Sequence, residues 1–277
     1  MSSYSSASSQ ATRRRLTNLD LAKMHASGEK IAVLTCYDAT FATLLDQSGV
    51  DILLVGDSLG MVLQGRDSTL AVSVADVAYH TAAVARGSQR AIVAADMPFG
   101  SYQESPAQAF RNAASLLAAG AHMVKIEGGA EMAETVAFLS QRGVPVWSHI
   151  GLTPQYVLQL GGYRVQGKDD AAAARILADA RVLKEAGAVQ LLIEAIPAPL
   201  AARITKEVGL PTIGIGAGAE TSGQVLVLHD MLNVLPDAKK PRFVRNFMAD
   251  QSSLQGAIQA YVGAVKNGTF PGPEHCY

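Results

Sequence analysis

Short apolar runs alternate with longer alanine-rich segments along the chain from about residue 30 onward. The apolar runs are hydrophobic throughout, which indicates strands covered on both faces, as in a parallel sheet. We predict these strands at 31–37, 51–56, 91–96, 122–127, 145–150, 190–195, 211–216 and 224–228. The helical spacing between them predicts helices at 39–48, 74–86, 106–119, 131–142, 171–187 and 198–208. Strands and helices therefore follow one another in repeated pairs.

About eight such pairs in one chain predict an α/β fold, a (β/α)8 TIM barrel. A doubly wound sheet is the alternative, but the glycines of 214–220 lack the GxGxxG spacing of a dinucleotide-binding loop. We expect residues 16–277 to form one barrel domain that ends in helices at 242–249 and 253–266. The segment 150–170 is too long for a simple connection, and we expect it to form a lid over a site.

The first residues differ in composition from the rest of the chain. Residues 1–15 are rich in serine and then in arginine, and no acidic residue occurs before Asp20. This composition is typical of a disordered tail, although an organelle transit peptide is similar. We interpret 1–15 as a disordered leader, and whether it is cleaved stays open.

The overall composition excludes several classes of partner. The 23 basic and 24 acidic residues nearly balance, so nothing predicts nucleic-acid binding. No apolar run approaches the roughly 20 residues of a membrane helix. The chain has only two cysteines, Cys36 and Cys276, which form neither a disulfide framework nor a zinc motif. We therefore expect a cytoplasmic protein.

Charged residues, in one case followed by a serine, occur where four of the predicted strands end. They are Asp57 and Ser58, Asp96, Lys125 and Glu127, and Glu194. A buried carboxylate is costly unless it is paired or binds a metal ion, so each of these acids needs an explanation. Any one of them is equally well explained as a solvated helix cap. Because the carboxyl ends of barrel strands meet at one face, the repetition favours a single site.

The residue types at this face favour chemistry on a magnesium ion. Several carboxylates with little sulfur or imidazole suit Mg²⁺ better than zinc. Glu127 shares a strand face with Lys125, so it binds the metal directly or through water, or chiefly neutralises Lys125. His149, at another strand end, is a site residue or a core residue. Mg²⁺ on an α-keto acid would stabilise an enolate, and Glu194 is the expected base.

Several sequence blocks resemble the ketopantoate hydroxymethyltransferase family, and the similarity extends from about Leu16 to the end. The blocks include LLVGDSLGMVLQGRDSTL (53–70), DMPFGSY (96–102), MVKIEGG (123–129), HIGLTPQ (149–155), GGYRVQG (161–167) and GQVLVLHDML (223–232). The resemblance departs in detail at Ala71, where the family often has Pro, and at Ser222, where it often has Asp. It implies a barrel of the phosphoenolpyruvate mutase/isocitrate lyase-like superfamily.

The resemblance also implies an activity. It is the transfer of a hydroxymethyl group from 5,10-methylenetetrahydrofolate to 3-methyl-2-oxobutanoate, which gives 2-dehydropantoate for pantothenate synthesis. The implied roles are Mg²⁺ binding by Asp57, Asp96 and Glu127, keto-acid binding by Asp57, Ser58, Asp96, Lys125 and His149, and proton abstraction by Glu194. The family forms homo-oligomers, commonly decamers. No folate-binding residue can be identified from the sequence.

Two other functions remain as alternatives. One is a Mg²⁺-dependent keto-acid carbon–carbon lyase of the isocitrate lyase type. Such lyases typically carry a catalytic cysteine on a mobile loop, whereas Cys36 lies in the first predicted strand and Cys276 in the tail. The other is a non-enzymatic scaffold protein, which would have no reason to keep acids at the strand ends. The positions of the two cysteines therefore disfavour the lyase, and the acids at the strand ends disfavour the scaffold protein.

Overall fold

The computed structural model describes residues 14–238 and 240–277, which form a closed barrel of eight parallel strands. The strands lie in chain order around the barrel, so each pairs with its neighbours in sequence and the last pairs with the first. They are β1 Ile31–Thr35, β2 Ile52–Val55, β3 Ile92–Asp96, β4 Met123–Glu127, β5 Val146–Gly151, β6 Gln190–Glu194, β7 Thr212–Ile215 and β8 Gly223–Leu226. The predicted (β/α)8 barrel and its strands are confirmed.

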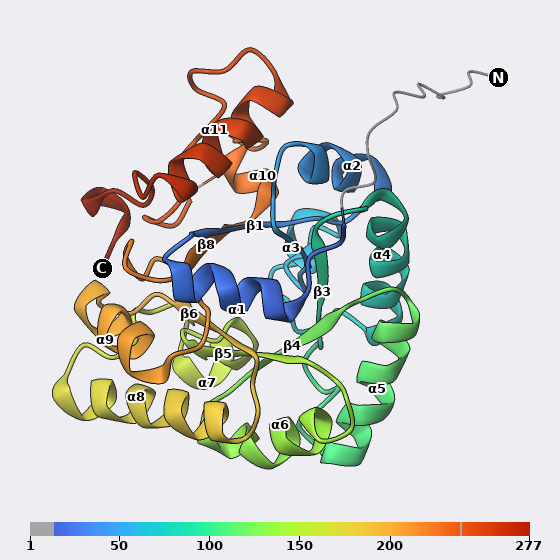
Figure 1. The fold of residues 1–277 in the computed structure, drawn as a ribbon, viewed down its shortest axis with the longest axis vertical. Helices are drawn as coiled ribbons and strands as arrows, with labels where there is room; N and C mark the ends of the chain where they lie inside the picture. Colours follow the sequence, from blue (N-terminus) through green and yellow to red (C-terminus); the bar gives the residue numbers. More distant parts are fainter. Residues whose placement is uncertain (1–13, 239) are drawn as a thin grey trace.

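Helices surround the barrel and bury the outer face of its strands (Figure 1). They are α2 Ala39–Gln47, α4 Val74–Gly87, α5 Pro106–Ala118, α6 Ala133–Ser140, α8 Asp170–Glu185, α9 Ala198–Val208 and α11 Leu254–Lys266. Nearly every strand residue is buried because side chains pack on these helices on one side and fill the barrel on the other. The six helices predicted between strands and the one at 253–266 are confirmed.

One helix that the sequence analysis missed, α1 Asn18–Ser27, lies across one end of the barrel (Figure 1). Its signal was present in the sequence. The Thr17 side chain accepts a hydrogen bond from the Asp20 backbone, and the Asp20 carboxylate accepts one from the Thr17 N–H. This reciprocal capping box marks a helix start. The buried Leu21 and Met24 close the amino-terminal end of the barrel.

The helix predicted at 242–249 is wrong, because this segment forms only turns. The Phe247 ring packs edge-on against Tyr261 of α11 with centroids 5.4 Å apart, and the Phe247 N–H donates to the Met231 carbonyl at 2.9 Å. Phe243 instead lines a cavity inside the barrel mouth. Contacts with two different parts of the molecule therefore override the local helical pattern.

Connections at the carboxyl ends of the strands contain only short helices. They are α3 Leu59–Val62, α7 Val157–Leu160 and α10 Leu228–Met231. The connection between β7 and β8 has no helix at all among its described residues 216–222. No helix in the described part of the chain is long and apolar enough to cross a membrane.

Most of the predicted leader, residues 1–13, lies outside the described residues. Arg14 and Arg15, which the sequence analysis also assigned to the leader, contact the fold. Arg14 forms an ion pair with Asp20 at 2.7 Å. The Arg15 guanidinium donates to the carbonyls of Ser88 at 2.5 Å and Ala91 at 2.6 Å, so it attaches the chain to the segment before β3.

The buried Asp51 joins the amino-terminal end of β2 to three other segments, and its replacement should destabilise the barrel. Asp51 Oδ1 pairs with Arg90 at 2.7 Å, and Oδ2 pairs with Lys266 at 2.7 Å and accepts the Ala32 N–H at 3.0 Å. Asp51→Asn removes the buried anion that faces both cations and leaves Lys266 with only the exposed Glu29 at 3.1 Å, so we expect the free energy of unfolding to fall by roughly 3 kcal/mol. Urea denaturation measures this change.

The matched control for Asp51→Asn is an exposed ion pair. Glu207 pairs with Arg203 on the surface of α9, where water already screens the charges. Glu207→Gln should therefore move the urea midpoint much less than Asp51→Asn. Equal shifts for the two variants would contradict the structural role of Asp51.

Candidate active site

A cavity of about 450 Å³ opens at the carboxyl ends of the barrel strands. All the site residues predicted from the sequence line it: Asp57, Ser58, Asp96, Lys125, Glu127, His149 and Glu194. They come from the ends of β2, β3, β4, β5 and β6 or from the residues directly after them. The structure thus brings the whole predicted set to one place, as the geometry of a parallel barrel requires.

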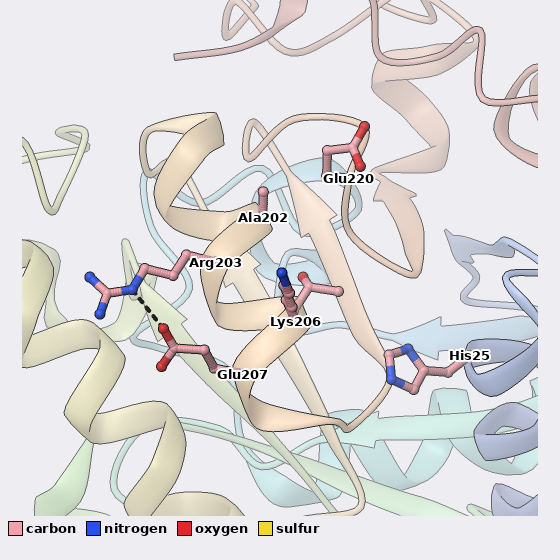
Figure 2. Close-up of a pocket in the computed structure, with 7 residues that line it drawn as sticks. His25, Ala202, Arg203, Lys206, Glu207 and Glu220 are labelled. Carbon is pink, nitrogen blue, oxygen red and sulfur yellow. Dashed lines mark hydrogen bonds and ion pairs between the residues drawn. The ribbon is translucent and has the colours of Figure 1, made fainter.

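A second cavity, of about 670 Å³, lies on the flank of the barrel and contains none of these residues (Figure 2). Charged side chains line it, including Arg203 and Lys206 of α9 and Glu220 before β8. Figure 2 shows Arg203 and Glu207 turned toward each other along α9, where they pair at 2.7 Å. Because Arg203 and Glu207 already pair with each other and no predicted site residue lies here, we place the candidate site in the cavity at the strand ends.

Asp57 and Asp96 are held together by the backbone. The Asp57 N–H donates to Asp96 Oδ2 at 2.9 Å, and both residues are buried. Glycine at position 56 leaves room for these polar groups, because a Cβ there would lie 2.8 Å from Ser58 Oγ and 3.4 Å from Asp96 Oδ2. Ser58 Oγ is itself hydrogen-bonded to the Tyr37 hydroxyl at 2.9 Å. Gly56 thus allows the two strand ends to present their polar groups side by side.

Lys125 connects two of the acids across neighbouring strands. It is the register partner of Asp96, and its Nζ lies 2.7 Å from Asp96 Oδ1 and 3.4 Å from Glu127 Oε1. Burial alone would lower the Lys125 pKa, but the charges of Asp96, Glu127 and Asp57 raise it above its ordinary value. Lys125 is therefore a permanently charged ammonium group inside the barrel.

His149 lies between Glu127 and Glu194. Its Nδ1 is 3.2 Å from Glu127 Oε1, and its Nε2 is 3.2 Å from Glu194 Oε2. Neither contact has the angles of a hydrogen bond, so both are ion pairs at short range. Burial would lower the His149 pKa, but the contacts with the two carboxylates raise it to about 9. The imidazole is therefore a cation at neutral pH.

Glu194 is the last residue of β6, and the backbone turns sharply after it. Ala195 has φ of 46°, in the left-handed region that a residue with a side chain rarely occupies. Strained backbone of this kind is concentrated at functional sites. The turn is held by the Ala195 N–H, which donates to the Ile215 carbonyl at 2.9 Å, and by the Gln166 N–H, which donates to the Ala195 carbonyl at 2.9 Å. The position of Glu194 at the cavity is thus fixed from both sides.

Two buried residues that the sequence did not indicate, Tyr102 and Gln155, form hydrogen bonds with Glu127 and Asp57. The Tyr102 hydroxyl accepts the Glu127 N–H at 3.0 Å, and the Gln155 side chain donates to Asp57 Oδ2 at 2.9 Å. Tyr102 is the last residue of the block DMPFGSY, and Gln155 is the last residue of the block HIGLTPQ, both of which resemble the family. These blocks could have pointed to the two residues, but neither lies among the polar residues at strand ends.

The donor set fits a divalent cation by its charge. Burial and the charges of Asp96 and Glu127 raise the Asp57 pKa well above its ordinary value, and Lys125 offsets this only in part, so a bound cation would stabilise the charged carboxylate. Asp57 and Asp96 offer oxygen ligands of the kind that Mg²⁺ prefers. In the described part of the chain, no three His, Cys, Asp or Glu side chains are arranged to hold a metal ion together. The three-ligand set with Glu127 stays a prediction.

The rest of the cavity wall is largely apolar. The segment 57–73 contributes Met61 and Val62, and the segment 150–170 contributes Pro154 and Tyr163. The second segment therefore borders the site as expected, and its function as a lid stays a prediction. Ser222, one of the positions that depart from the family, precedes β8 at the opposite end of the barrel, where its Oγ contacts His25 Nδ1 at 2.8 Å. This departure is remote from the cavity.

Neither cysteine is placed as a nucleophile at this cavity. Cys36 is buried after β1, where burial raises its thiol pKa to about 12. Cys276 lies in the C-terminal tail, where burial also raises its pKa. A thiolate is the nucleophilic form of cysteine, so both side chains are poorly suited to catalysis.

Comparisons with known proteins identify close relatives. Residues 15–273 match the family model described as ketopantoate hydroxymethyltransferase. The chain is 63% identical to the 3-methyl-2-oxobutanoate hydroxymethyltransferase of Dechloromonas aromatica (strain RCB), over 98% of this chain and 99% of that protein. It is 58% identical to the enzyme of the same name from Janthinobacterium sp. (strain Marseille), over the full length of both.

Among solved structures, the fold is similar to that of more distant proteins. A putative phosphonomutase from Burkholderia cenocepacia J2315 aligns with a TM-score of 0.65 at 17% identity, over 79% of this chain and 96% of that one. A 2,3-dimethylmalate lyase, a member of the PEP mutase/isocitrate lyase superfamily, aligns with a TM-score of 0.56 at 15% identity, over 92% and 99%. The phosphonopyruvate hydrolase in complex with oxalate and Mg²⁺ aligns with a TM-score of 0.59 at 15% identity, over 91% and 85%. These likenesses show the fold alone, which is the predicted barrel.

Proposed function

The chain belongs to the ketopantoate hydroxymethyltransferase family, and from this premise we propose how its cavity performs the reaction. The hydroxymethyl group comes from 5,10-methylenetetrahydrofolate and is added to 3-methyl-2-oxobutanoate, which gives 2-dehydropantoate. The observation that carries the proposal is the position of Glu194. It borders the cavity but is separated from the Asp57 and Asp96 pair by Lys125, Glu127 and His149.

Asp57 and Asp96 are the residues that would hold a Mg²⁺ ion. Such an ion supplies a Lewis acid for the ketone oxygen and stabilises the charge of an enolate. Glu127 supports these ligands electrostatically, because its Oε1 already faces Lys125 and His149 and its Oε2 accepts the Gln155 N–H at 2.9 Å. The oxalate and Mg²⁺ named for the phosphonopyruvate hydrolase are compatible with this use of the barrel.

Lys125 and Ser58 bind and orient the keto acid. Lys125 is a buried cation at the cavity wall, which suits the substrate carboxylate. Ser58 Oγ is aligned by the Tyr37 hydroxyl and offers a further hydrogen bond to a substrate oxygen. His149 completes the set, since its positive charge lies next to the region where negative charge develops.

Glu194 removes the proton from C3 of the keto acid, and the enolate carbon then attacks the methylene carbon of the folate. The new carbon–carbon bond forms as one of the two carbon–nitrogen bonds of the methylene group breaks, and the freed nitrogen takes the proton that Glu194 removed. Water then breaks the second carbon–nitrogen bond: its oxygen becomes the hydroxyl of the product and its proton goes to the other nitrogen of tetrahydrofolate. Protonated His149 keeps Glu194 oriented toward the cavity through their 3.2 Å contact. General-base catalysis of this kind typically contributes a factor of about 10² to 10⁴.

A lyase of the isocitrate lyase type is the weaker alternative. The relatives at 58% identity and above are named hydroxymethyltransferases, whereas the lyase-like proteins share only the fold. Cys36 and Cys276 also have raised thiol pKa values, which disfavours the thiolate that such a lyase uses. We further propose that the protein works in the cytoplasm as a homo-oligomer, a decamer by resemblance.

The direct test of this function is product formation by the purified protein. We expect 2-dehydropantoate by mass spectrometry when 3-methyl-2-oxobutanoate, 5,10-methylenetetrahydrofolate and Mg²⁺ are all present. Omission of the folate or chelation of the metal should stop the reaction. Cleavage of 2,3-dimethylmalate with no 2-dehydropantoate formed would instead favour the lyase.

Asp57→Asn should weaken the dependence on Mg²⁺. The substitution keeps the size of the side chain but removes one anionic ligand, so we expect the Mg²⁺ concentration for half-maximal activity to rise at least tenfold. A Mg²⁺ titration of the exchange or transfer reaction measures this shift. An unchanged titration curve would remove Asp57 from the ligand set.

A further inference from the structure

Gln155 connects the ends of three strands although it follows a fourth. It lies in the turn Pro154–Tyr156 after β5, and its side chain is 2% exposed. Its Nε2 donates to Asp57 Oδ2 at 2.9 Å and to the Met97 carbonyl at 3.0 Å. Its backbone N–H donates to Glu127 Oε2 at 2.9 Å. One residue therefore contacts groups at the ends of β2, β3 and β4.

The Met97 carbonyl and the Asp57 carboxylate determine which way the Gln155 amide faces. Both accept a hydrogen bond from the amide, so the Gln155 NH₂ group must face them and Oε1 must face away. Oε1 lies 2.7 Å from the Tyr102 hydroxyl and accepts from it, and the same hydroxyl accepts the Glu127 N–H at 3.0 Å. Every polar atom of the Gln155 side chain is thus satisfied, and a flipped amide would place its oxygen against two acceptors.

These contacts hold one oxygen of each carboxylate. Asp57 Oδ2 is held by Gln155, whereas Asp57 Oδ1 forms no hydrogen bond to a described residue. Glu127 Oε2 is held by the Gln155 backbone, whereas Oε1 faces Lys125 at 3.4 Å. Gln155 therefore fixes the two acids relative to each other, with the free oxygen of Asp57 available at the cavity.

We propose that Gln155 is the positioning residue of the metal site, because it holds the carboxylates of Asp57 and Glu127 in the arrangement that a divalent cation needs. The inference rests on the proposed function, which assigns Mg²⁺ to Asp57 and Asp96. Hydrogen bonds to metal-binding carboxylates typically change metal affinity by 10- to 100-fold. Gln155 makes such a bond from a fully buried position, where water cannot replace it.

The experiment titrates the metal-free protein with Mn²⁺ and follows the free ion by electron paramagnetic resonance. Gln155→Met keeps the length of the side chain and the backbone N–H but removes the amide donors. We expect the affinity for Mn²⁺ to fall about tenfold, with native circular dichroism. Tyr102→Phe, which keeps the amide but removes the hydroxyl that donates to its Oε1, should lower the affinity by a smaller factor in the same direction.

The matched control is Gln190→Met. Gln190 is also a fully buried glutamine, on β6, but its amide has no hydrogen-bond partner in the described part of the chain. We expect this variant to bind Mn²⁺ within twofold of the wild type. An equal loss in Gln190→Met would show a general effect of buried substitutions and overturn the positioning role.

The outcomes separate this inference from the proposed function. A wild-type protein that binds no Mn²⁺ would overturn the metal assignment and the role of Gln155 with it. Wild-type binding with unchanged affinity in Gln155→Met would overturn the positioning role alone. If Gln155→Met does not fold, Tyr102→Phe decides, and wild-type affinity in that variant overturns the inference.

Discussion

Glu194→Gln should abolish proton exchange at C3 of 3-methyl-2-oxobutanoate while Mn²⁺ or Mg²⁺ still binds. The amide has nearly the same shape but cannot accept a proton, so we expect the exchange rate to fall by about 10³. Metal binding should persist because Glu194 contacts His149 and not the Asp57 and Asp96 pair. Proton exchange followed by nuclear magnetic resonance, together with a metal titration, measures both effects.

The control for Glu194→Gln is the same substitution at Glu185, an exposed residue at the end of α8. Glu185→Gln should exchange the proton at the wild-type rate. Exchange at the wild-type rate in Glu194→Gln would remove Glu194 from the role of base. Loss of exchange together with loss of metal binding would place Glu194 in the metal site instead.

Lys125→Met should destabilise the metal-free protein by about 3 to 5 kcal/mol. Lys125 Nζ lies 2.7 Å from Asp96 and 3.4 Å from Glu127, so its removal leaves the buried Asp96 without its cation and Glu127 with His149 alone. Mg²⁺ should recover more stability in this variant than in the wild type, because a bound cation stabilises the folded state in proportion to its affinity. Urea denaturation with and without Mg²⁺ measures both changes.

The loss caused by Lys125→Met should shrink in acid. Burial would raise the Glu127 pKa, but Lys125 and His149 lower it from 4.5 to about 2. A carboxylate whose pKa is lower in the folded than in the unfolded protein stabilises the folded state at pH values above its unfolded pKa. For Glu127 this stabilisation is lost as the pH falls from about 4.5 toward 2. The two proteins should therefore converge over that window. The exposed Lys184→Met serves as control, and an equal effect in both variants would contradict the buried pair.

The predicted site was correct where the argument depended on the barrel itself. A parallel barrel places the carboxyl ends of all its strands at one face, so Asp57, Asp96 and Glu194 had to meet there if the strands were right. The spacing of Lys125 and Glu127 likewise required a shared strand face. The sequence could therefore predict which acids converge, because only strand existence and direction were needed.

The features that the sequence did not reveal depend on long-range contacts. Gln155 follows β5, and nothing local indicates that its amide reaches Asp57 across the barrel. The segment 242–249 has a helical pattern, but its aromatic side chains pack on α11 and line the cavity instead. In both cases the outcome depends on residues distant in the chain, which local pattern and propensity cannot place.

Deuterium incorporation into 3-methyl-2-oxobutanoate in D₂O tests the central claim, which is that this cavity removes the C3 proton before any carbon is transferred. We predict that the wild-type protein with Mg²⁺ exchanges this proton in the complete absence of folate. Exchange should stop when the metal is chelated and when Glu194 is replaced by Gln. A protein that forms 2-dehydropantoate with the folate donor, yet exchanges no proton without it, would contradict the account.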